Sequence, residues 1–125
     1  PDDPTETIVG ATRDPQFGGL LMFGLGGIFV QMFEDTAFRV APVTGREARE
    51  MTDEIRAAAM LRGARGREPA DVASVVETIQ RVSQLVTDFP AIRELDINPL
   101  VVSPDGVRAV DFRLTLDRDE YATRR

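Results

Sequence analysis

The sequence predicts an α+β fold in which a mostly antiparallel sheet carries two helices on one face. Short β-branched or alternating segments, bounded by turn residues, occur near both ends of the chain. Two stretches between them have apolar residues at helical spacing. Because the strands are grouped rather than alternating with helices, the predicted order β-β-β-β-α-α-β-β favours the α+β class over a parallel α/β sheet.

The first half of the chain is predicted to form four strands. Residues 5–13 are rich in Thr, Ile and Val and are followed by Asp14-Pro15, a turn signal. Residues 17–33 are almost free of charge, but a span of that length is at the lower edge of the roughly 17–25 residues that cross a bilayer, and it contains glycines. We therefore expect strands at residues 20–23 and 28–33 around a glycine turn, not a membrane span. Residues 36–41 should pair back as a further strand.

The middle of the chain is predicted to form two helices. Thr44 and Glu47 have the spacing of a capping box, which marks a helix start. Residues 62–68 form a loop, and Pro69 suits the first position of the second helix. The apolar positions expected to face the core are Ala48, Met51, Ile55, Ala58 and Ala59 in the first helix and Val72, Val75, Val76, Ile79, Val82 and Val86 in the second.

A β-hairpin is predicted to end the domain. Residues 92–102 alternate as a half-buried strand does, with Leu95, Ile97 and Val101 inward. Residues 103–106, Ser-Pro-Asp-Gly, are a turn signal, and residues 107–114 should form the partner strand. We expect residues 1–116 to form one domain and residues 117–125 to form a charged, frayed tail.

Composition excludes several classes of site. The chain has a net charge of -6, so we expect no nucleic-acid partner, and we expect neither a membrane partner nor a secretory leader, which makes a cytoplasmic location the default. It has no cysteine and no histidine. Thiol chemistry, histidine acid-base catalysis and Cys/His zinc sites are therefore absent, and any bound metal must have oxygen ligands.

The last hairpin gathers oxygen-bearing side chains. Because side chains alternate along a strand, Glu94, Asp96 and Asn98 should share the face opposite Leu95. If the loop has four residues, Asn98 lies across from Asp111 and Asp96 across from Arg113. Opposed side chains are then close enough to share a cation, and two protein oxygens suit Mg²⁺.

Two alternatives remain open for this hairpin. A three-residue loop with a glycine bulge would shift the pairing by one residue and turn Asp111 to the other face. Alternatively, the polar residues form a solvated sheet face in which Asp96 and Arg113 are an ordinary cross-strand pair.

Phosphate contacts are also expected upstream. Gly26 and Gly27, in the run Gly24-Leu25-Gly26-Gly27, can bring backbone N–H groups to a phosphate, although a tight turn explains the same glycines. Arg13 can face a phosphate or a partner domain.

A family resemblance is visible in the last hairpin. It is carried by residues 94–100, Glu-Leu-Asp-Ile-Asn-Pro-Leu, and by Ala109-Val110-Asp111. These residues resemble the metal-binding hairpin of the ATP-grasp domain in ADP-forming (NDP-forming) acyl-CoA and acetyl-CoA synthetases. The succinyl-CoA synthetase β chain is a more distant likeness. Residues 9–18, 23–28 and 63–71 are similar to the same synthetases, so the likeness covers nearly the whole chain to about residue 116.

This resemblance implies a second ATP-grasp subdomain that acts with Mg²⁺ and ATP or ADP. The implied reaction joins an acid to CoA with cleavage of ATP to ADP and phosphate, through a phosphohistidine. It implies that Asn98 and Asp111 hold Mg²⁺ and that Asp96 is a catalytic acidic residue near the phosphohistidine.

The resemblance also implies partners, since the family's lysine-bearing N-terminal lobe and its CoA-binding or ligase domains have no counterpart in this chain. The isolated chain is therefore expected to be inactive. Gln31 stands where relatives often have glutamate, which leaves a second hypothesis: a non-catalytic docking or regulatory grasp domain, as in acyltransferase fusions.

Overall fold

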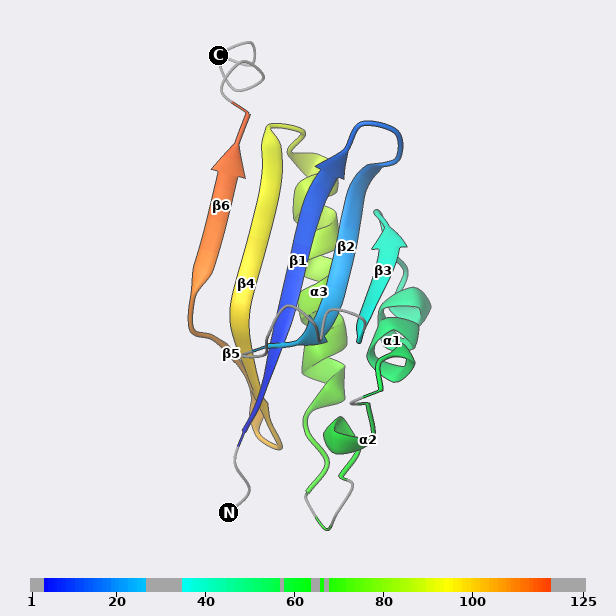
Figure 1. Cartoon of the computed structure of the whole chain (residues 1–125), viewed down its shortest axis with the longest axis vertical. Coiled ribbons are helices and arrows are strands. Elements are labelled where there is room, and N and C mark those ends of the chain that lie inside the picture. The colour runs from blue at the N-terminus through cyan, green and yellow to red at the C-terminus, as the bar shows by residue number, and fades with distance from the viewer. Residues whose placement is uncertain (1–3, 27–34, 57, 64–65, 67, 118–125) are drawn as a thin grey trace.

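A computed structural model describes residues 4–26, 35–56, 58–63, 66 and 68–117. These residues form a six-stranded antiparallel sheet with helices on one face (Figure 1). The spatial order is β3-β2-β1-β4-β5, and β6 also pairs with β4. The predicted α+β class is confirmed. The strands are β1 (Thr5–Asp14), β2 (Gly18–Leu25), β3 (Thr36–Val40), β4 (Ile92–Ser103), β5 (Gly106–Ala109) and β6 (Phe112–Leu116).

The turn between β1 and β2 follows from its sequence. The Asp14 carboxylate accepts hydrogen bonds from the backbone N–H groups of Gln16 and Phe17, at 2.7 and 2.9 Å. Gly18 has a φ of 83°, a conformation that glycine adopts without steric cost. β2 then runs back along β1, so residues 18–25 are part of a sheet. The predicted strand at residues 28–33 lies outside the described residues.

Helix α1 (Gly45–Glu54) begins with the predicted capping box, in which Thr44 and Glu47 exchange side-chain-to-backbone hydrogen bonds. The helix predicted to continue past Ile55 is interrupted there, and α2 (Ala58–Leu61) is a separate short helix. The Asp35 carboxylate accepts the backbone N–H of Arg56, a donor that a continuous helix would use internally. The prediction that Ile55 and Ala58 face the core is confirmed, since both are buried. The same prediction for Ala59 is wrong, because the break places this residue on the exposed side of α2.

Helix α3 (Val72–Asp88) is capped by Asp71, whose carboxylate accepts the Ser74 N–H at 3.0 Å. The prediction that Pro69 takes the first helical position is therefore wrong by a few residues, because a side-chain acceptor fixes the start. The predicted apolar stripe packs on β1, β2 and β4, behind the sheet in Figure 1. Its buried members are Val75, Val76, Ile79, Val82 and Val86.

Strand β4 changes phase in its middle. Leu95 and Ile97 are buried beneath the helices, but the next buried residues are Leu100 and Val102, with Asn98 and Pro99 between the two pairs. The β1 pairing shifts by one residue at the same place, between Thr7 and Val9. We call this two-residue step the β4 phase break. It makes the prediction that Val101 faces inward wrong, since strict alternation fails at a bulge.

The helices leave one face of the sheet uncovered (Figure 1). The hydrophobic core lies entirely between the helices and the other face and includes Leu21, Phe23, Met51, Ile79 and Leu95. No helix in the described part of the chain is long and apolar enough to cross a membrane.

Candidate functional site

The uncovered face of the sheet carries a row of residues that crosses five strands. Phe38 pairs with Met22, Met22 with Gly10, Gly10 with Asp96, and Asp96 with Arg113. The row therefore begins with apolar side chains on β3 and β2, has no side chain on β1, and ends with opposite charges on β4 and β6. Adjacent to it runs a second row, consisting of Val40, Leu20, Thr12, Glu94 and Thr115.

Most residues of these two rows line a groove of about 380 Å³, which we call the open-face groove. Gly10 forms part of its floor. A Cβ at Gly10 would lie 3.2 Å from the Leu95 carbonyl oxygen and 3.5 Å from the Met22 methyl carbon. Because β1 contributes only a glycine here, the groove has space for a ligand between its apolar and charged ends.

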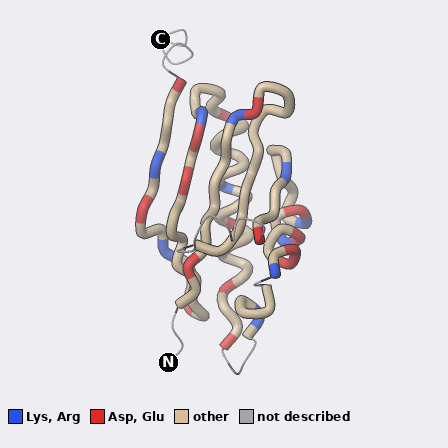
Figure 2. Tube along the Cα trace, viewed as in Figure 1, with Lys and Arg blue, Asp and Glu red and all other residues tan. Residues whose placement is uncertain are grey.

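Charge is confined to one end of the open-face groove. Figure 2 shows acidic positions along β4 and a basic position on β6, whereas β2 has no charged residue. The charged residues that line the groove are Glu94, Asp96 and Arg113, and the apolar side is Leu20, Met22 and Phe38. The groove thus suits a ligand whose uncharged part contacts the apolar side. An anionic part of the ligand could bind at the charged end through Arg113, or through a metal ion held between it and the carboxylates.

Asn98 and Asp111 face each other across the hairpin, as the sequence predicts. Val102 pairs with Val107 and Asp96 with Arg113, so the register of the four-residue loop holds along the hairpin, and the one-residue shift does not occur. The Asn98 backbone N–H donates to the Asp111 carbonyl oxygen at 3.1 Å, and Val110 N–H to the Pro99 carbonyl oxygen at 3.1 Å. Both residues are exposed and lie at the β4 phase break.

Asp96 lies two residues before Asn98 on β4 and is half-buried. Burial raises the pKa of its carboxyl above the ordinary value; Arg113 opposes this shift, and the charges of Asp111 and Glu94 add to it. Asp96 and Asp111 are therefore close enough to repel each other. A cation between them would relieve that repulsion.

The two predicted phosphate-binding glycines have different outcomes. Gly26 donates its N–H to the Glu6 carbonyl oxygen at 2.9 Å, and a Cβ there would lie 2.9 Å from the Thr7 carbonyl oxygen. Close backbone packing therefore explains this glycine, and its N–H is already used. Gly27 lies outside the described residues. Phosphate binding by this pair stays a prediction.

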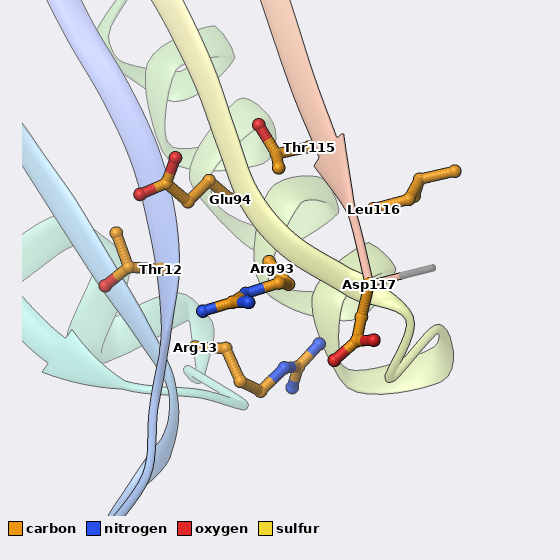
Figure 3. Close-up of a pocket in the computed structure, with 7 residues that line it drawn as sticks. All are labelled: Thr12, Arg13, Arg93, Glu94, Thr115, Leu116 and Asp117. Carbon is orange, nitrogen blue, oxygen red and sulfur yellow. The ribbon is translucent and has the colours of Figure 1, made fainter. Parts of the chain in front are cut away.

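Arg13 ties the end of α3 to the sheet. Its guanidinium donates to the carbonyl oxygens of Val86 at 2.9 Å, Ile92 at 2.8 Å and Phe89 at 3.2 Å. It also lines a second hollow of about 500 Å³, with Arg93 (Figure 3). These contacts support a structural role, and the predicted phosphate contact of Arg13 stays a prediction.

The sequence of residues 1–116 matches the family described as the ATP-grasp domain. The chain belongs to the ATP-grasp family.

Several relatives of this ATP-grasp chain are named as ADP-forming ligases. It is 47% identical over 118 residues to the acetate–CoA ligase (ADP-forming) I of Archaeoglobus fulgidus, covering 94% of this chain and 17% of that protein. It is 49% identical over 111 residues to the β subunit of acetate–CoA ligase (ADP-forming) I of Pyrococcus furiosus, covering 89% of this chain and 48% of that subunit. The chain thus spans less than half of the length of either relative. The predicted resemblance to the ATP-grasp domain of ADP-forming acetyl-CoA synthetases is confirmed.

Solved structures agree with this ATP-grasp assignment. The dinucleotide-forming acetyl-coenzyme A synthetase 1 of Ca. Korarchaeum cryptofilum, in complex with coenzyme A and Mg-AMPPCP, superposes with a TM-score of 0.86 at 41% identity. The alignment covers 93% of this chain and 54% of that chain. In that complex the phosphohistidine segment points towards the nucleotide-binding site.

Across the residues that the structure describes, no three His, Cys, Asp or Glu side chains gather into a metal site. Asn98 and Asp111 nevertheless fit Mg²⁺, because they provide hard oxygen donors beside a repelling carboxylate, and Mg²⁺ takes further ligands from water and phosphates.

Sequence reasoning missed the apolar half of the open-face groove. Met22 and Phe38 were assigned only to strands, and Gly10 had no assigned role. A glycine in the interior of a strand is a signal for close approach of a ligand or backbone, and this signal would have indicated Gly10.

Proposed function

We propose that this chain is the Mg²⁺- and phosphate-handling part of the grasp domain of an ADP-forming acyl-CoA synthetase. The proposed reaction is acid + CoA + ATP to acyl-CoA + ADP + phosphate. The observation that carries the proposal is the hairpin register, in which Asn98 lies opposite Asp111, two residues along β4 from Asp96 at the charged end of the open-face groove. The ADP-forming ligases among its relatives support the same conclusion.

Each residue of this site has a defined task in the proposal. Asn98 and Asp111 hold Mg²⁺ through side-chain oxygens. When bound, Mg²⁺ supplies charge neutralisation on the transferred phosphoryl group, which is a main source of catalysis in phosphoryl transfer. Asp96 contributes a carboxylate that orients the incoming phosphate carrier. The apolar side of the groove, with Met22 and Phe38, takes the uncharged part of the nucleotide.

The proposal requires other parts of a larger protein or complex. The chain contains no histidine, so a phosphohistidine has to come from elsewhere. The open-face groove lies on one side of a single sheet, and a second lobe is needed to enclose a nucleotide and exclude water. The acid and CoA would bind in those other parts.

The experiment uses the complete synthetase that contains this chain. Asn98→Ala and Asp111→Ala should each lower Mg²⁺-dependent ATP formation from acyl-CoA, ADP and phosphate by about 10²-fold or more, as loss of one transition-state contact does. The Mg²⁺ concentration for half-maximal rate should rise. Asp105→Ala, in the turn of the same hairpin, is the control and should leave both values unchanged.

Two results would decide against this assignment. Turnover within twofold of wild type in both variants would remove the metal role of the pair. Nucleotide binding without turnover in the unaltered full-length protein would support a docking or regulatory domain instead. Gln31, which suggested that alternative, lies outside the described residues.

A further inference from the structure

Arg113 occupies the charged end of the open-face groove. It lies on β6, directly across from Asp96 on β4, in the row that ends at the sheet's edge. Opposed residues in an antiparallel pair have Cβ atoms about 4.5–5.5 Å apart. Of the described residues that line the groove, Arg113 is the only cation. Any anionic group that enters the groove therefore meets Arg113.

The donors of Arg113 are not used within the fold. In the described part of the chain its side chain makes no hydrogen bond and no ion pair within 4.0 Å. Some other arginines do have such partners: Arg39 pairs with Glu54 at 2.7 Å and Arg81 with Glu77 at 2.9 Å. Arg13, described above, is bound to backbone carbonyls. Within the described residues, the charge of Arg113 acts on Asp96 across the strand pair, and its N–H donors remain available to a ligand.

The surroundings of Arg113 favour an anion of particular chemistry. Two carboxylates, Glu94 and Asp96, lie on the neighbouring strand at this end of the groove and repel a lone anion. A phosphoryl group that arrives with Mg²⁺ brings its own compensating charge. A guanidinium has five N–H donors in a planar fork, so one edge can contact Asp96 while the other binds two phosphoryl oxygens.

We propose that Arg113 is a phosphoryl-binding residue of the open-face groove, contacting phosphate oxygens on the side of the groove next to Asp96. This inference rests on the proposed function, since it assigns a second phosphoryl contact to the same site. The phosphoryl group belongs either to the nucleotide or to free inorganic phosphate. Both sources present the same oxyanion to the guanidinium.

The test compares Arg113→Ala and Arg113→Lys in the complete synthetase, assayed for ATP formation. Arg113→Ala should lower kcat/KM by about 10²-fold, and Arg113→Lys should restore part of the loss because it keeps the charge but not the fork. Added guanidinium ion should raise the rate of Arg113→Ala severalfold without affecting wild type. Arg108→Ala, an exposed arginine on the same hairpin, is the matched control and should behave as wild type.

The kinetic constants identify the source of the phosphoryl group. A rise in KM for phosphate alone assigns Arg113 to inorganic phosphate, whereas a rise in KM for Mg-ADP alone assigns it to the nucleotide. A thermal melt of each variant separates a lost contact from lost folding. If Arg113→Ala unfolds, the loss of kcat/KM in Arg113→Lys, which keeps the charge but not the planar fork, replaces it as the readout.

A rate for Arg113→Ala within twofold of wild type would overturn this inference, as would a loss shared by Arg108→Ala. Its failure is distinguishable from failure of the proposed function. An active Arg113→Ala beside inactive Asn98→Ala and Asp111→Ala removes only the arginine contact. Activity in all three variants removes both proposals.

Discussion

The two faces of the sheet are built from alternate residues of the same strands, yet they have opposite chemistry. On the helix-covered face, Leu21, Phe23 and Leu95 are buried and form the core. On the open face, their neighbours in the chain are Met22 and Asp96, which line a groove. Burial of apolar area on one face supplies the stability that lets the other face hold charged, incompletely paired groups. The domain therefore separates folding from ligand binding by face rather than by segment.

Replacing Leu95 by Ala should have the largest effect on stability. Leu95 is 2% exposed in the centre of the core, and a Leu→Ala change at such a site costs about 2–5 kcal/mol. Urea unfolding of the domain measures this loss. Its neighbour Asp96, changed to Ala, is the control from the other face and should not destabilise the fold. Equal losses at both positions would contradict the separation of faces.

Replacing Arg13 by Ala should cost less, about 2 kcal/mol, because it removes charge-assisted hydrogen bonds to the end of α3. Thermal or urea unfolding gives the value. Arg81→Ala, which removes an exposed pair with Glu77 on the same helix, should cost only about 0.3–0.5 kcal/mol. If Arg13→Ala instead leaves stability unchanged and weakens phosphate binding, the sequence-based prediction for Arg13 is the better one.

Replacing Gly10 by Val should act mainly on the open face. The new side chain would occupy the groove between Met22 and Asp96, so affinity of the complete grasp domain for Mg-ADP should fall at least tenfold, or about 1.4 kcal/mol. Part of the effect should appear in stability, about 1–3 kcal/mol, because the new Cβ would lie 3.2 Å from the Leu95 carbonyl oxygen. Calorimetric titration measures the affinity. Gly45→Ala on α1, away from the groove, is the control and should bind normally.

Replacing Asp96 by Asn should change the free energy of unfolding least, and it should raise stability where the other replacements lower it. Burial raises the pKa of Asp96 in the folded state, so its contribution to stability is fully present below the unfolded pKa and is lost as pH rises through the folded pKa. Without metal, the variant should be slightly more stable than wild type at neutral pH. The difference should disappear below about pH 3.9, the ordinary pKa of Asp. Unfolding midpoints in a chelating buffer across this range test it, and a destabilised variant at neutral pH would contradict the assignment.

Local sequence signals predicted the elements that local chemistry controls. The Thr44 capping box, the α3 stripe and the Ser103–Gly106 register all held, because each depends on residues near one another in the chain. The break after Ile55 was not predictable in this way. It depends on Asp35, twenty-one residues away in sequence, taking a backbone donor from the helix.

The candidate site was predicted only in part, because some of its contacts join residues far apart in the sequence. The hairpin register set Asn98 opposite Asp111 from local turn chemistry. The open-face groove, by contrast, needs β3, β2, β1, β4 and β6 in order, and strand order is not encoded in any one segment. Gly10 and Met22 became site residues only once their strands were aligned. The roles assigned to Asp96, Asn98, Asp111, Arg13, Gly26 and Gly27 stay predictions.

The β4 phase break also governs which changes in chain length this domain tolerates. Thr7 donates its hydroxyl to the Leu100 carbonyl oxygen at 2.8 Å beside the break, holding the two halves of the strand in their separate phases. Lengthening the Pro104-Asp105 turn changes only the tip of the hairpin. Deleting Pro99 alone would remove the extra residue of β4 and restore strict alternation between Ile97 and Leu100. Counted from the hairpin turn, Asn98 would then lie opposite Val110 instead of Asp111. Insertions and deletions accumulated over time should therefore collect at the hairpin tip and avoid the step beside Asn98.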